Sequence, residues 1–504
     1  FGKKTSLPII SYSGLEQEFF LIDRNFVFGR PDLLTAGRTL FGANPANGKE
    51  FEDQDYGVMP RRVMSCIRGA VRELYKLGVP VRTHHNEVAP SQYEIAPVFE
   101  TANLAIDHNQ LMMTVLKKVA KRHGLHCLLH EKPFSGINGS GKHLNYSIGN
   151  AEVGTLFEPG ETPHENAMFL VFLVAAIRGL HKYGGLLRAT VAAASNDHRL
   201  GANEAPPAIL SMFLGDQLTD ILEQFRVGQV RGSKGKRLMN VGVDTLPPLP
   251  ADPGDRNRTS PFAFTGNRFE FRALGSSMPA SASQTALNTI MSDSLDYAAT
   301  RLEKLSGGDP EKLHAAVGKL IQEIVEEHSA VIFNGDGYSD AWVEEAAERG
   351  LPNYKTTADC VPHYADEKNV KLFEKFGIFS KAEIEARVEI LLESYSKTIN
   401  IEALTMIDMA KKKYIPACLA YSKELADAIA VKKSIDVCTC VEKDLVKKVT
   451  EETEKAYDAV QKLEEVTAVA AAKTCMQEMA NAYRDTVLPV MEDLRKAVDA
   501  LEVL

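Results

Sequence analysis

The sequence predicts an α+β fold followed by a mainly helical C-terminal region. Between residues 11 and 274, short segments of alternating apolar and polar residues are separated by longer stretches with helical periodicity. From about residue 309 the sequence pattern changes, and residues 368–504 consist mainly of helix-forming residues at helical spacing. We therefore expect an α+β domain over residues 1–308 and a mainly helical region over residues 309–504.

The composition is that of an ordinary globular protein, with 44% hydrophobic and 25% charged residues among 504. This length suggests roughly two to four domains. The net charge of −9 argues against nucleic acid as a partner. The longest apolar run, Ala167 to Ile177, is too short to span a bilayer. We therefore expect neither a nucleic acid nor a membrane as partner.

The seven cysteines are scattered and include one C-x-C pair, Cys438 and Cys440, but no C-x-x-C pair. This pattern is typical of a reducing compartment and of mostly buried thiols. It predicts a cytoplasmic protein.

The first strand is expected over residues 11–23. Its alternation places Glu16 and Glu18 on one face, about 7 Å apart along the strand, and Leu15 and Phe19 on the other. The alternative is an exposed edge with solvated acids, but solvation poorly explains two acids on an otherwise apolar strand.

Residues 24–60 are rich in Gly, Pro, Asn and Asp and are expected to form a long loop. An amphipathic helix follows over residues 61–77, closed by Gly78 and Pro80. A second helix is expected over residues 100–123.

Between these helices, Glu87 and Glu94 lie in two short segments separated by a turn at Pro90. Proline presets its own φ and biases the residue before it toward extended geometry, so the chain should reverse there. The two carboxylates would then converge, and their repulsion is usually relieved by a hydrogen-bond donor or a cation. The alternative is a surface hairpin with solvated acids.

Residues 136–142 match the phosphate-binding pattern G-x-x-x-x-G-K. A true P-loop continues with Ser or Thr and opens into a helix, whereas His143 follows here and the next residues alternate as a strand. We therefore reject a P-loop. The glycine turn instead presents Asn138 and His143 to a site, and the strand places His143, Asn145 and Ser147 on one face.

An apolar helix is expected over residues 164–194, followed by a polar loop over residues 195–207 in which Arg199 and Glu204 stand out. Residues 227–266 are punctuated by Gly and Pro and contain Arg258.

A further strand over residues 267–274 carries Arg268, Glu270 and Arg272 on one face and two phenylalanines on the other. This ladder of charges could be solvated. The aromatic back face favours a position lining a cavity.

In the C-terminal region, Pro416 and Pro489 are expected to interrupt the helices, and residues 441–504 to form two long helices as a bundle or hairpin. We find no chemistry-bearing motif there.

The strands thus carry five candidate carboxylates and one imidazole, with arginines close by in sequence. Such a donor set suits hard divalent cations, Mg²⁺ or Mn²⁺, and its size suggests two or three ions. The arginines suggest an anionic substrate. The pattern therefore predicts metal-assisted phosphoryl chemistry without a P-loop. The candidates are Glu16, Glu18, Glu87, Glu94, Glu270 and His143.

Four segments, residues 14–21, 84–94, 138–143 and 267–272, resemble in order the signature segments of glutamine synthetases. The loop at 196–207 and the long helical region look most like the type III class. The resemblance implies a catalytic domain built on a curved antiparallel sheet with packed helices. It also implies a homo-oligomer of stacked rings, most often a dodecamer.

The resemblance implies two metal positions. Glu18, Glu87 and Glu94 match the ligands of the metal that helps to bind glutamate. The ligands of the metal that bridges the phosphates of ATP match Glu16, His143 and Glu270.

The resemblance also implies roles for the remaining polar residues. Glutamate-binding positions match Asn138, Gly139, Arg199 and Arg272, and ATP-binding positions match Asn145, Ser147, Arg258 and Arg268. Arg258 and Arg272 are expected to assist catalysis at the phosphate, and Glu204 matches the flap acid that accepts a proton from ammonium.

Three departures from the family pattern stand out. The residues before Glu16 are too few to supply the small β domain of the family, so we expect it upstream. An arginine usually found five residues after the Arg258 position is Ala263 here. The tyrosine modification motif of the type I class is not recognisable.

The implied reaction joins glutamate and ammonia to glutamine, with ATP converted to ADP and phosphate through a γ-glutamyl phosphate. Two alternatives remain open: a related enzyme that ligates glutamate to another amine, and a non-catalytic member kept as a structural or regulatory ring. The six metal-ligand positions argue against the second alternative.

Overall fold

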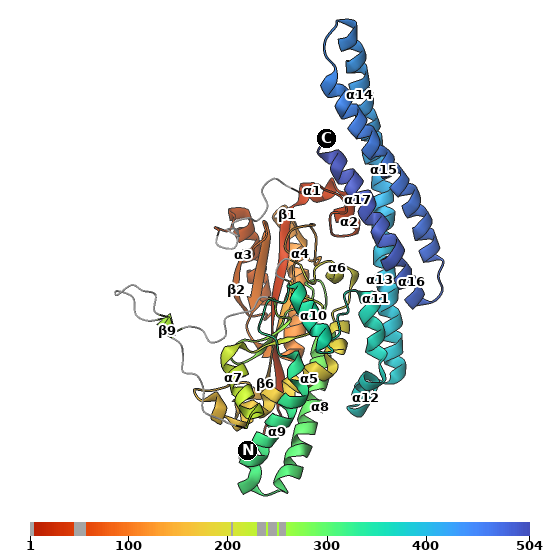
Figure 1. The fold of residues 1–504 in the computed structure, drawn as a ribbon. Helices are drawn as coiled ribbons and strands as arrows, with labels where there is room; N and C mark the ends of the chain where they lie inside the picture. The colour runs from red at the N-terminus through yellow and green to blue at the C-terminus, as the bar shows by residue number, and fades with distance from the viewer. Residues whose placement is uncertain (1–4, 45–56, 203–204, 229–237, 240–248, 251–258) are drawn as a thin grey trace.

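The computed structural model describes residues 5–44, 57–202, 205–228, 238–239, 249–250 and 259–504. A curved sheet with helices packed on it forms the body of the molecule. A bundle of C-terminal helices runs along one side and continues into a projecting helical hairpin (Figure 1).

The main sheet has ten strands, seven of which follow the order β2-β3-β1-β6-β12-β11-β8. The strands on this path are β1 (Ile10–Asp23), β2 (Val81–Asn86), β3 (Gln92–Pro97), β6 (Lys142–Asn150), β8 (Met212–Phe213), β11 (Phe262–Phe264) and β12 (Phe269–Phe271). Three others lie off it: β4 (Glu100–Thr101) and β5 (Leu125–Leu128), which pair with β1, and β7 (Gly154–Thr155), which pairs with β6. The short strands β9 (Leu238–Met239) and β10 (Leu249–Pro250) form a separate pair.

The pairing is antiparallel except between β8 and β11, which run parallel. The expected antiparallel sheet thus includes one parallel pair at this edge. The chain between β8 and β11 contains a helix, Gly215–Arg226, rather than a tight turn alone, so nothing local forces the two strands to be antiparallel.

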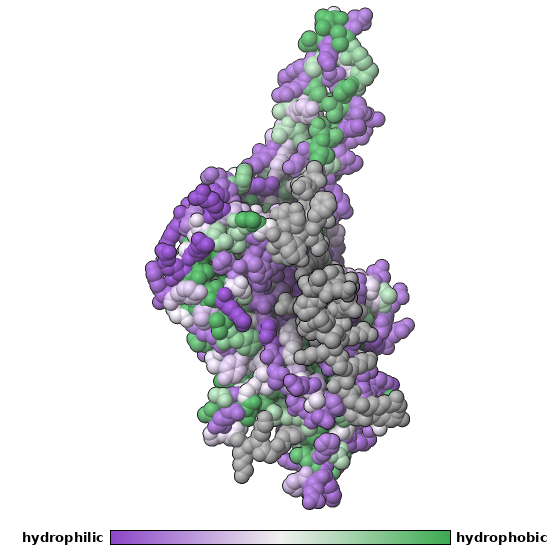
Figure 2. Space-filling view, turned by 90° about the vertical axis from the view of Figure 1, so that its left-hand side faces the viewer, coloured by the Kyte–Doolittle hydropathy of each residue, from purple (hydrophilic) through white to green (hydrophobic). Residues whose placement is uncertain are grey.

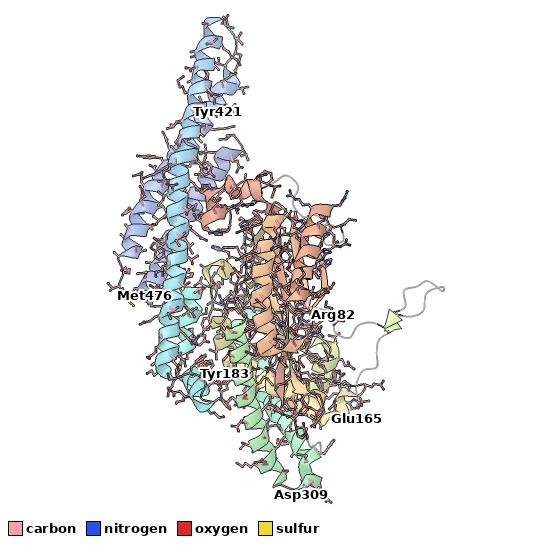
Figure 3. All side chains as sticks on the ribbon, turned by 180° about the vertical axis from the view of Figure 1, so that it is seen from behind. Arg82, Glu165, Tyr183, Asp309, Tyr421 and Met476 are labelled. Carbon is pink, nitrogen blue, oxygen red and sulfur yellow. A yellow bond between two sulfur atoms is a disulfide. The ribbon has the colours of Figure 1, made fainter. Side chains whose placement is uncertain are left out.

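Strand β1 lies in the middle of the sheet and organises it. Its alternation is the predicted one, with Leu15, Phe19 and Leu21 buried beneath helices. The helices α3 (Arg61–Lys76) and α4 (Ala102–Arg122) cover one part of this face. Figure 3 shows these two helices in front of the sheet, seen from behind.

A second part of the same face is covered by three further helices: α5 (Ala167–Ala189), α8 (Ser281–Ser306) and α9 (Leu313–His328). They pack on Leu144 and Tyr146 of β6 and on both phenylalanines of β12. The opposite face of the sheet is therefore left to the polar residues that alternate with these apolar ones.

Helix α5 is long and apolar enough to cross a membrane by length and composition, with a mean hydropathy of 1.3. However, 78% of that stretch is buried inside the protein. It is the central helix of the main core.

Several short helices were not predicted. Residues 24–60 were expected to form a loop, but α1 (Arg24–Phe28) and α2 (Pro31–Thr35) lie there. The Asp23 side chain accepts a hydrogen bond from the Asn25 N–H, and Pro31 occupies the first turn of α2, so local capping forms both helices. The expected loop at 195–207 likewise begins with α6 (Ala194–Asp197), and the Gly- and Pro-rich stretch contains β11.

The remaining elements connect the sheet to the C-terminal bundle. The α-helices are α7 (Gly215–Arg226), α10 (Asp340–Glu348), α11 (Thr357–Cys360) and α12 (Glu367–Lys375). Short 3₁₀ turns are η1 (Pro163–Glu165), η2 (Pro310–Lys312), η3 (Ser329–Val331) and η4 (Val361–Ala365).

The C-terminal bundle consists of α13 (Lys381–Met409), α14 (Ile415–Ser434), α15 (Cys440–Ala471), α16 (Met476–Ala482) and α17 (Leu488–Glu502). Two π-helical turns, η5 (Ala410–Tyr414) and η6 (Tyr483–Val487), join α13 to α14 and α16 to α17.

The sequence predicted that Pro416 and Pro489 interrupt the helices, but neither proline breaks the helical path. Each proline lies in the first turn of a helix, directly after a π-helical turn. A proline lacks an N–H group and cannot donate to the turn before it, and the wider π-helical turn accommodates the missing hydrogen bond, so the helical path continues.

The projecting hairpin is formed by α14 and α15. Ion pairs join it at both ends, from Lys411 to Glu464 and from Lys432 to Glu442. Its tip exposes apolar residues, including Val431, Ile435, Val437 and Val441, and Figure 2 shows this hydrophobic surface. Leu419, nearer the base of α14, is also exposed.

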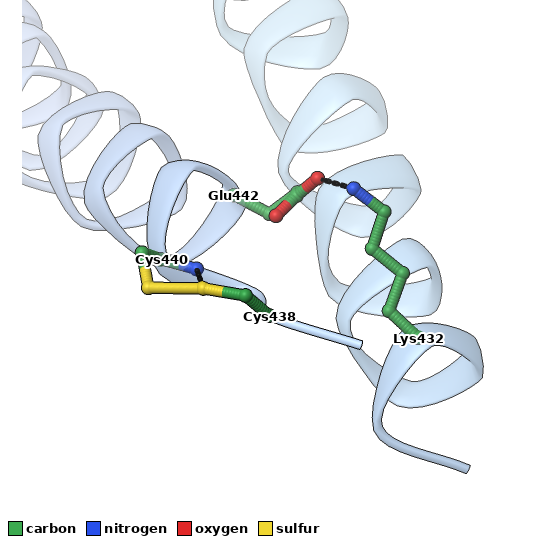
Figure 4. Close-up of a disulfide and its surroundings, with 4 residues drawn as sticks. All are labelled: Lys432, Cys438, Cys440 and Glu442. Atoms are coloured by element: carbon green, nitrogen blue, oxygen red, sulfur yellow. Dashed lines mark hydrogen bonds and ion pairs between the residues drawn. A yellow bond between two sulfur atoms is a disulfide. The ribbon is translucent and has the colours of Figure 1, made fainter. Parts of the chain in front are cut away.

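The C-x-C pair forms a disulfide between Cys438 and Cys440 at the hairpin tip, beside the Lys432–Glu442 ion pair (Figure 4). These two cysteines depart from the expectation of mostly buried thiols, because a turn brings their sulfur atoms together. The thiols of Cys66, Cys127 and Cys360 are buried as expected, whereas Cys418 is half-buried and Cys475 is exposed.

Candidate functional site

The polar face of the sheet gathers the predicted carboxylates and the imidazole. Strand pairing sets their positions: Glu16 lies opposite His143, and Glu18 lies opposite Glu94. On the far side of β6, Glu270 lies opposite the neighbouring position, Asn145.

The first group of possible metal ligands consists of Glu16, His143 and Glu270, with donor atoms within 4.8 Å of one another. The Nδ1 atom of His143 lies 3.3 Å from Glu16 Oε2 and 3.3 Å from Glu270 Oε1. These are the three residues that the resemblance assigns to the ATP-side metal.

The second group consists of Glu18, Glu94 and His143, again within 4.8 Å. The His143 Nε2 atom lies 3.5 Å from Glu18 Oε1, so the two ring nitrogens face different carboxylates. The structure thus brings Glu18 and Glu94 together, as predicted for the glutamate-side metal.

Glu87, the third predicted ligand of that metal, groups with Glu94 and with a residue not predicted, His85. The His85 ring lies 2.9 Å from Glu94 Oε1 through Nε2 and 3.5 Å from Glu87 Oε1 through Nδ1. His85 lies two residues before Glu87, and this i, i+2 spacing at the end of β2 was the signal that could have identified it.

These groups are electrostatically crowded. Burial, together with Glu18 and Glu94, raises the pKa of Glu87 to about 9. Burial opposes a charge on His143, yet the surrounding carboxylates outweigh burial and raise its pKa to about 10. The Glu94 carboxylate likewise raises the pKa of His85 to about 10.

Such crowding means that protons or cations must balance the carboxylates. A donor set of several carboxylate oxygens with one or two imidazoles fits Mg²⁺ or Mn²⁺ better than zinc or copper. The residues present therefore fit divalent cations.

The predicted glutamate-binding residues lie beside Glu18. Arg199 is 2% exposed and donates through NH2 to the Arg272 carbonyl oxygen at 3.0 Å. A Cβ atom at Gly141 would lie 2.2 Å from a guanidinium nitrogen of Arg199, and one at Gly139 would lie 2.9 Å from its Cγ. Both glycines therefore allow Arg199 to approach the turn. The Gly141 N–H in turn donates to the Glu18 carboxylate.

Asn138 and Arg272 complete this side of the site. Asn138 is buried in the turn before β6, and Arg272 is buried at the end of β12. The NH1 atom of Arg272 lies 3.6 Å from Glu270 Oε1, which links the substrate side to the first group of ligands.

A cavity of about 640 Å³ opens beside Glu16. Asn145, Ser147 and Arg268, which the resemblance assigns to ATP binding, line it, and so does Arg82, labelled on β2 in Figure 3. Asn145 donates to Glu16 Oε1 at 3.0 Å and accepts from Arg268 Nε at 3.0 Å. A hydrogen-bonded chain thus runs from the arginine to the first ligand group.

Two predicted residues, Glu204 and Arg258, lie outside the described residues. At the position where the family carries a further arginine, Ala263 is buried in β11 and lies opposite Glu270.

Comparison with protein families matches residues 4–209 to "Glutamine synthetase, catalytic domain" and residues 316–433 to "Glutamine synthetase C-terminal domain". Among curated proteins, the chain is 46% identical over 493 residues to a glutamine synthetase of Butyrivibrio fibrisolvens, covering 97% of this chain and 70% of that protein. It is 45% identical over 498 residues to a type-3 glutamine synthetase of Dictyostelium discoideum, covering 97% and 67%. A glutamine synthetase of Bacteroides fragilis is 41% identical over 510 residues, covering 99% and 70%.

Among solved structures, one titled "Apo GmaS without ligand" matches with a TM-score of 0.39 and 18% sequence identity. The match covers 64% of this chain and 68% of that one.

Proposed function

Because this chain belongs to the glutamine synthetase family, we propose that it converts glutamate, ATP and ammonia to glutamine, ADP and phosphate. Family membership gives the reaction class, a glutamate–ammonia ligase. In the first step the γ-phosphate of ATP moves to the side-chain carboxylate of glutamate. Ammonia then attacks the γ-glutamyl phosphate and phosphate leaves.

The observation that carries the proposal is the pair of ligand groups that share His143, beside a cavity of about 640 Å³. Divalent cations held there would neutralise charge on the phosphates of ATP. The ATP-side cation would be held by Glu16, His143 and Glu270, and the glutamate-side cation by Glu18, Glu87 and Glu94.

The basic residues of the chain orient the two anionic reactants. We place the polyphosphate along the cavity wall near Arg268 and Asn145, whose hydrogen bond fixes both side chains. Arg199 lies against the glycine turn and would bind a carboxylate of glutamate there, with Asn138 and Gly139. Arg272, between the two sides, would stabilise charge on the transferred phosphoryl group, together with Arg258.

Ammonium must lose a proton before it can attack. We propose that the Glu204 carboxylate, in the loop after Arg199, attracts the cation and accepts that proton.

For the whole protein, we propose a cytoplasmic homo-oligomer of stacked rings, most simply a dodecamer, with the catalytic unit over residues 1–308. The resemblance to the type III class supports this assembly.

The decisive experiment is phosphate release by the purified protein with ATP, glutamate and Mg²⁺ or Mn²⁺, before and after addition of ammonium. We expect release that requires glutamate and rises on addition of ammonium, with glutamine as product. A parallel assay with methylamine tests the alternative of another amine. Phosphate release that does not change on addition of ammonium, or that is faster with methylamine than with ammonium, would contradict the proposal.

A further inference from the structure

A second cavity, of about 280 Å³, lies away from the ligand groups, between the chain before the glycine turn and the C-terminal bundle. Lys132 and Ser135 line it from the first side, and His198 lies beside them. Arg495 of α17 and Met406 of α13 close the other side. None of its lining residues lines the 640 Å³ cavity.

Three cationic side chains line the cavity, Arg38, Lys132 and Arg495, together with one carboxylate, Glu492, on the exposed rim. Carboxylates behind the wall pair with two of the cations, Glu402 with Arg38 and Asp499 with Arg495. Arg495 is held by Asp499 at 3.1 Å and by the carbonyl oxygens of residues 39 and 42.

Arg38 is held in place but retains free hydrogen-bonding capacity. Its Nε and NH2 atoms donate to Glu402 at 2.8 and 2.7 Å. Among the described residues no acceptor meets its NH1 atom. A guanidinium fixed on one edge by a buried carboxylate is ready to bind a second carboxylate on the other edge.

His198 is a second polar group at the cavity that can form a further hydrogen bond. Its ring faces the cavity and forms no hydrogen bond with any other residue in the described part of the chain. The neighbouring wall is apolar, formed by Leu40, Met406, Leu488 and Met491. A ligand that suits both surfaces has an anionic head and a short aliphatic chain.

We propose that this cavity binds a small organic carboxylate, with the carboxylate at Arg38 and His198 and its chain against Leu488 and Met491. The ligand would act on the catalytic site through two short connections. Lys132 and Ser135 lead directly into the turn that carries Asn138, and His198 precedes Arg199 in the chain. Occupancy would therefore change the affinity for glutamate, a consequence that rests on the proposed function.

Succinate is a suitable probe, and its binding is measured by calorimetry on the full chain without ATP. Ser135→Asp places a negative charge on the exposed rim without removing a contact, and we expect about tenfold weaker binding. Ser135→Asn is the neutral control and should bind as the parent does. Glu492→Gln removes the opposing rim charge and should bind about threefold more tightly.

The opposite signs of these two changes exclude damage to the fold as an explanation, because damage does not strengthen binding. If neither variant changes the affinity for succinate, succinate binds elsewhere and the proposal is overturned. The absence of binding at millimolar succinate would also overturn it. Inorganic phosphate is titrated in parallel, and phosphate binding without succinate binding would also overturn the assignment of a carboxylate ligand.

The coupling is tested separately by titrating glutamate with and without saturating succinate. We expect a several-fold shift in glutamate affinity, and by linkage the same shift in succinate affinity when glutamate is present. If succinate binds in the cavity but glutamate does not bind at all, the proposed function fails while the carboxylate site stands.

Discussion

At the scale of single residues, His143 holds the most informative position. Its Nδ1 atom faces Glu16 and Glu270, and its Nε2 atom faces Glu18. When one ring nitrogen binds a cation, the other becomes an N–H donor to the opposite group of carboxylates. The imidazole therefore ties the two metal positions together electrostatically.

Glu270→Ala should weaken binding of the ATP-side metal. The Glu270 side chain lies on β12, with Oε1 3.3 Å from the Nδ1 atom of His143. Because Glu270 is buried, water does not readily take its place as a ligand. Even losses outside the direct ligands typically reduce metal affinity by about 10- to 100-fold, and we expect at least that. Mn²⁺ and Mn²⁺–ATP binding by calorimetry gives the answer, with Glu348→Ala, on the exposed surface of α10, as control. Unchanged affinity in the Glu270 variant would remove this residue from the ligand set.

Glu204→Ala should lose ammonium-dependent synthesis by about 10²-fold or more, the usual scale for a positioned base. Hydroxylamine is largely neutral at pH 7 and needs no deprotonation, so its reaction should fall much less. Both rates are measured under saturating ATP and glutamate. An equal fall in the two rates would mean that Glu204 acts only in closing the loop.

Gly141→Ala should weaken glutamate binding while the protein still folds. The new methyl group would meet the Arg199 guanidinium at 2.2 Å, and the far end of a side chain can move where a backbone cannot. Displacing that group from the turn should raise the KM for glutamate by about tenfold, the scale of one lost charge-assisted hydrogen bond. Gly318→Ala is the control, since the closest atom to its Cβ is 4.0 Å away. A Gly141 variant with normal KM would show that Arg199 does not contact glutamate.

Much of the site could be predicted because alternation along a strand fixes which residues share a face. Glu16 with Glu18, and His143 with Asn145, follow from period two alone. The meeting of His143 with Glu270 could not, because it depends on β6 and β12 being neighbours in the sheet. The resemblance supplied that contact, and neither route identified His85.

At the scale of elements, long segments with strong periodicity were predictable and short ones were not. The expected helix over residues 61–77 is α3, and the two long C-terminal helices are α15 and the α16–α17 unit. The two-residue strand β8 carries too little sequence for any pattern, and only its place beside β11 makes it a strand.

The junction between α13 and the chain after α2 depends on the Arg38–Glu402 pair. Glu402 is 2% exposed and Arg38 is 12% exposed, so Glu402→Gln leaves a buried guanidinium without its counter-charge. Removing one partner of a buried pair typically costs about 3–5 kcal/mol in the free energy of unfolding. Urea denaturation measures this loss. Glu464→Gln, in the exposed pair with Lys411, is the control and should cost under about 1 kcal/mol.

The same pair should make stability depend on pH. Burial opposes ionisation of Glu402, but the Arg38 guanidinium outweighs burial and lowers the pKa of this carboxyl group. A lowered pKa means that the unfolded chain binds the proton more readily, so the pair stabilises fully above the unfolded pKa of about 4.3. This stabilisation is lost as the pH falls through the folded pKa. The difference in unfolding free energy between the parent and Glu402→Gln should therefore shrink on acidification. A constant difference down to that range would contradict the assignment.

At the scale of the whole molecule, the projecting hairpin stands apart from the catalytic sheet (Figure 1). The ion pairs Lys411–Glu464 and Lys432–Glu442 show which residues of α14 and α15 lie opposite each other. By this register the two ends of segment 421–453 lie side by side, so a short Gly-Ser linker can replace that segment. We expect the shortened protein to fold and to bind Mn²⁺ with unchanged affinity, because the cores of the sheet remain intact. Circular dichroism and calorimetry test this. Loss of metal binding in a folded, shortened protein would show that the hairpin supports the site.

Strand β1 has a consequence for how the molecule moves. One edge of β1 pairs with β6 over residues 10–17 and with β5 over residues 20–23. The other edge pairs with β4 at residues 12–13 and with β3 at residues 17–20. We expect the amide protons held in these pairings to exchange with solvent only when the paired strands separate, at a free energy close to that of complete unfolding. Glu16 and Glu18 therefore lie on a strand that opens slowly. We expect substrate entry and product release to depend on the surrounding loops and not on opening of the sheet.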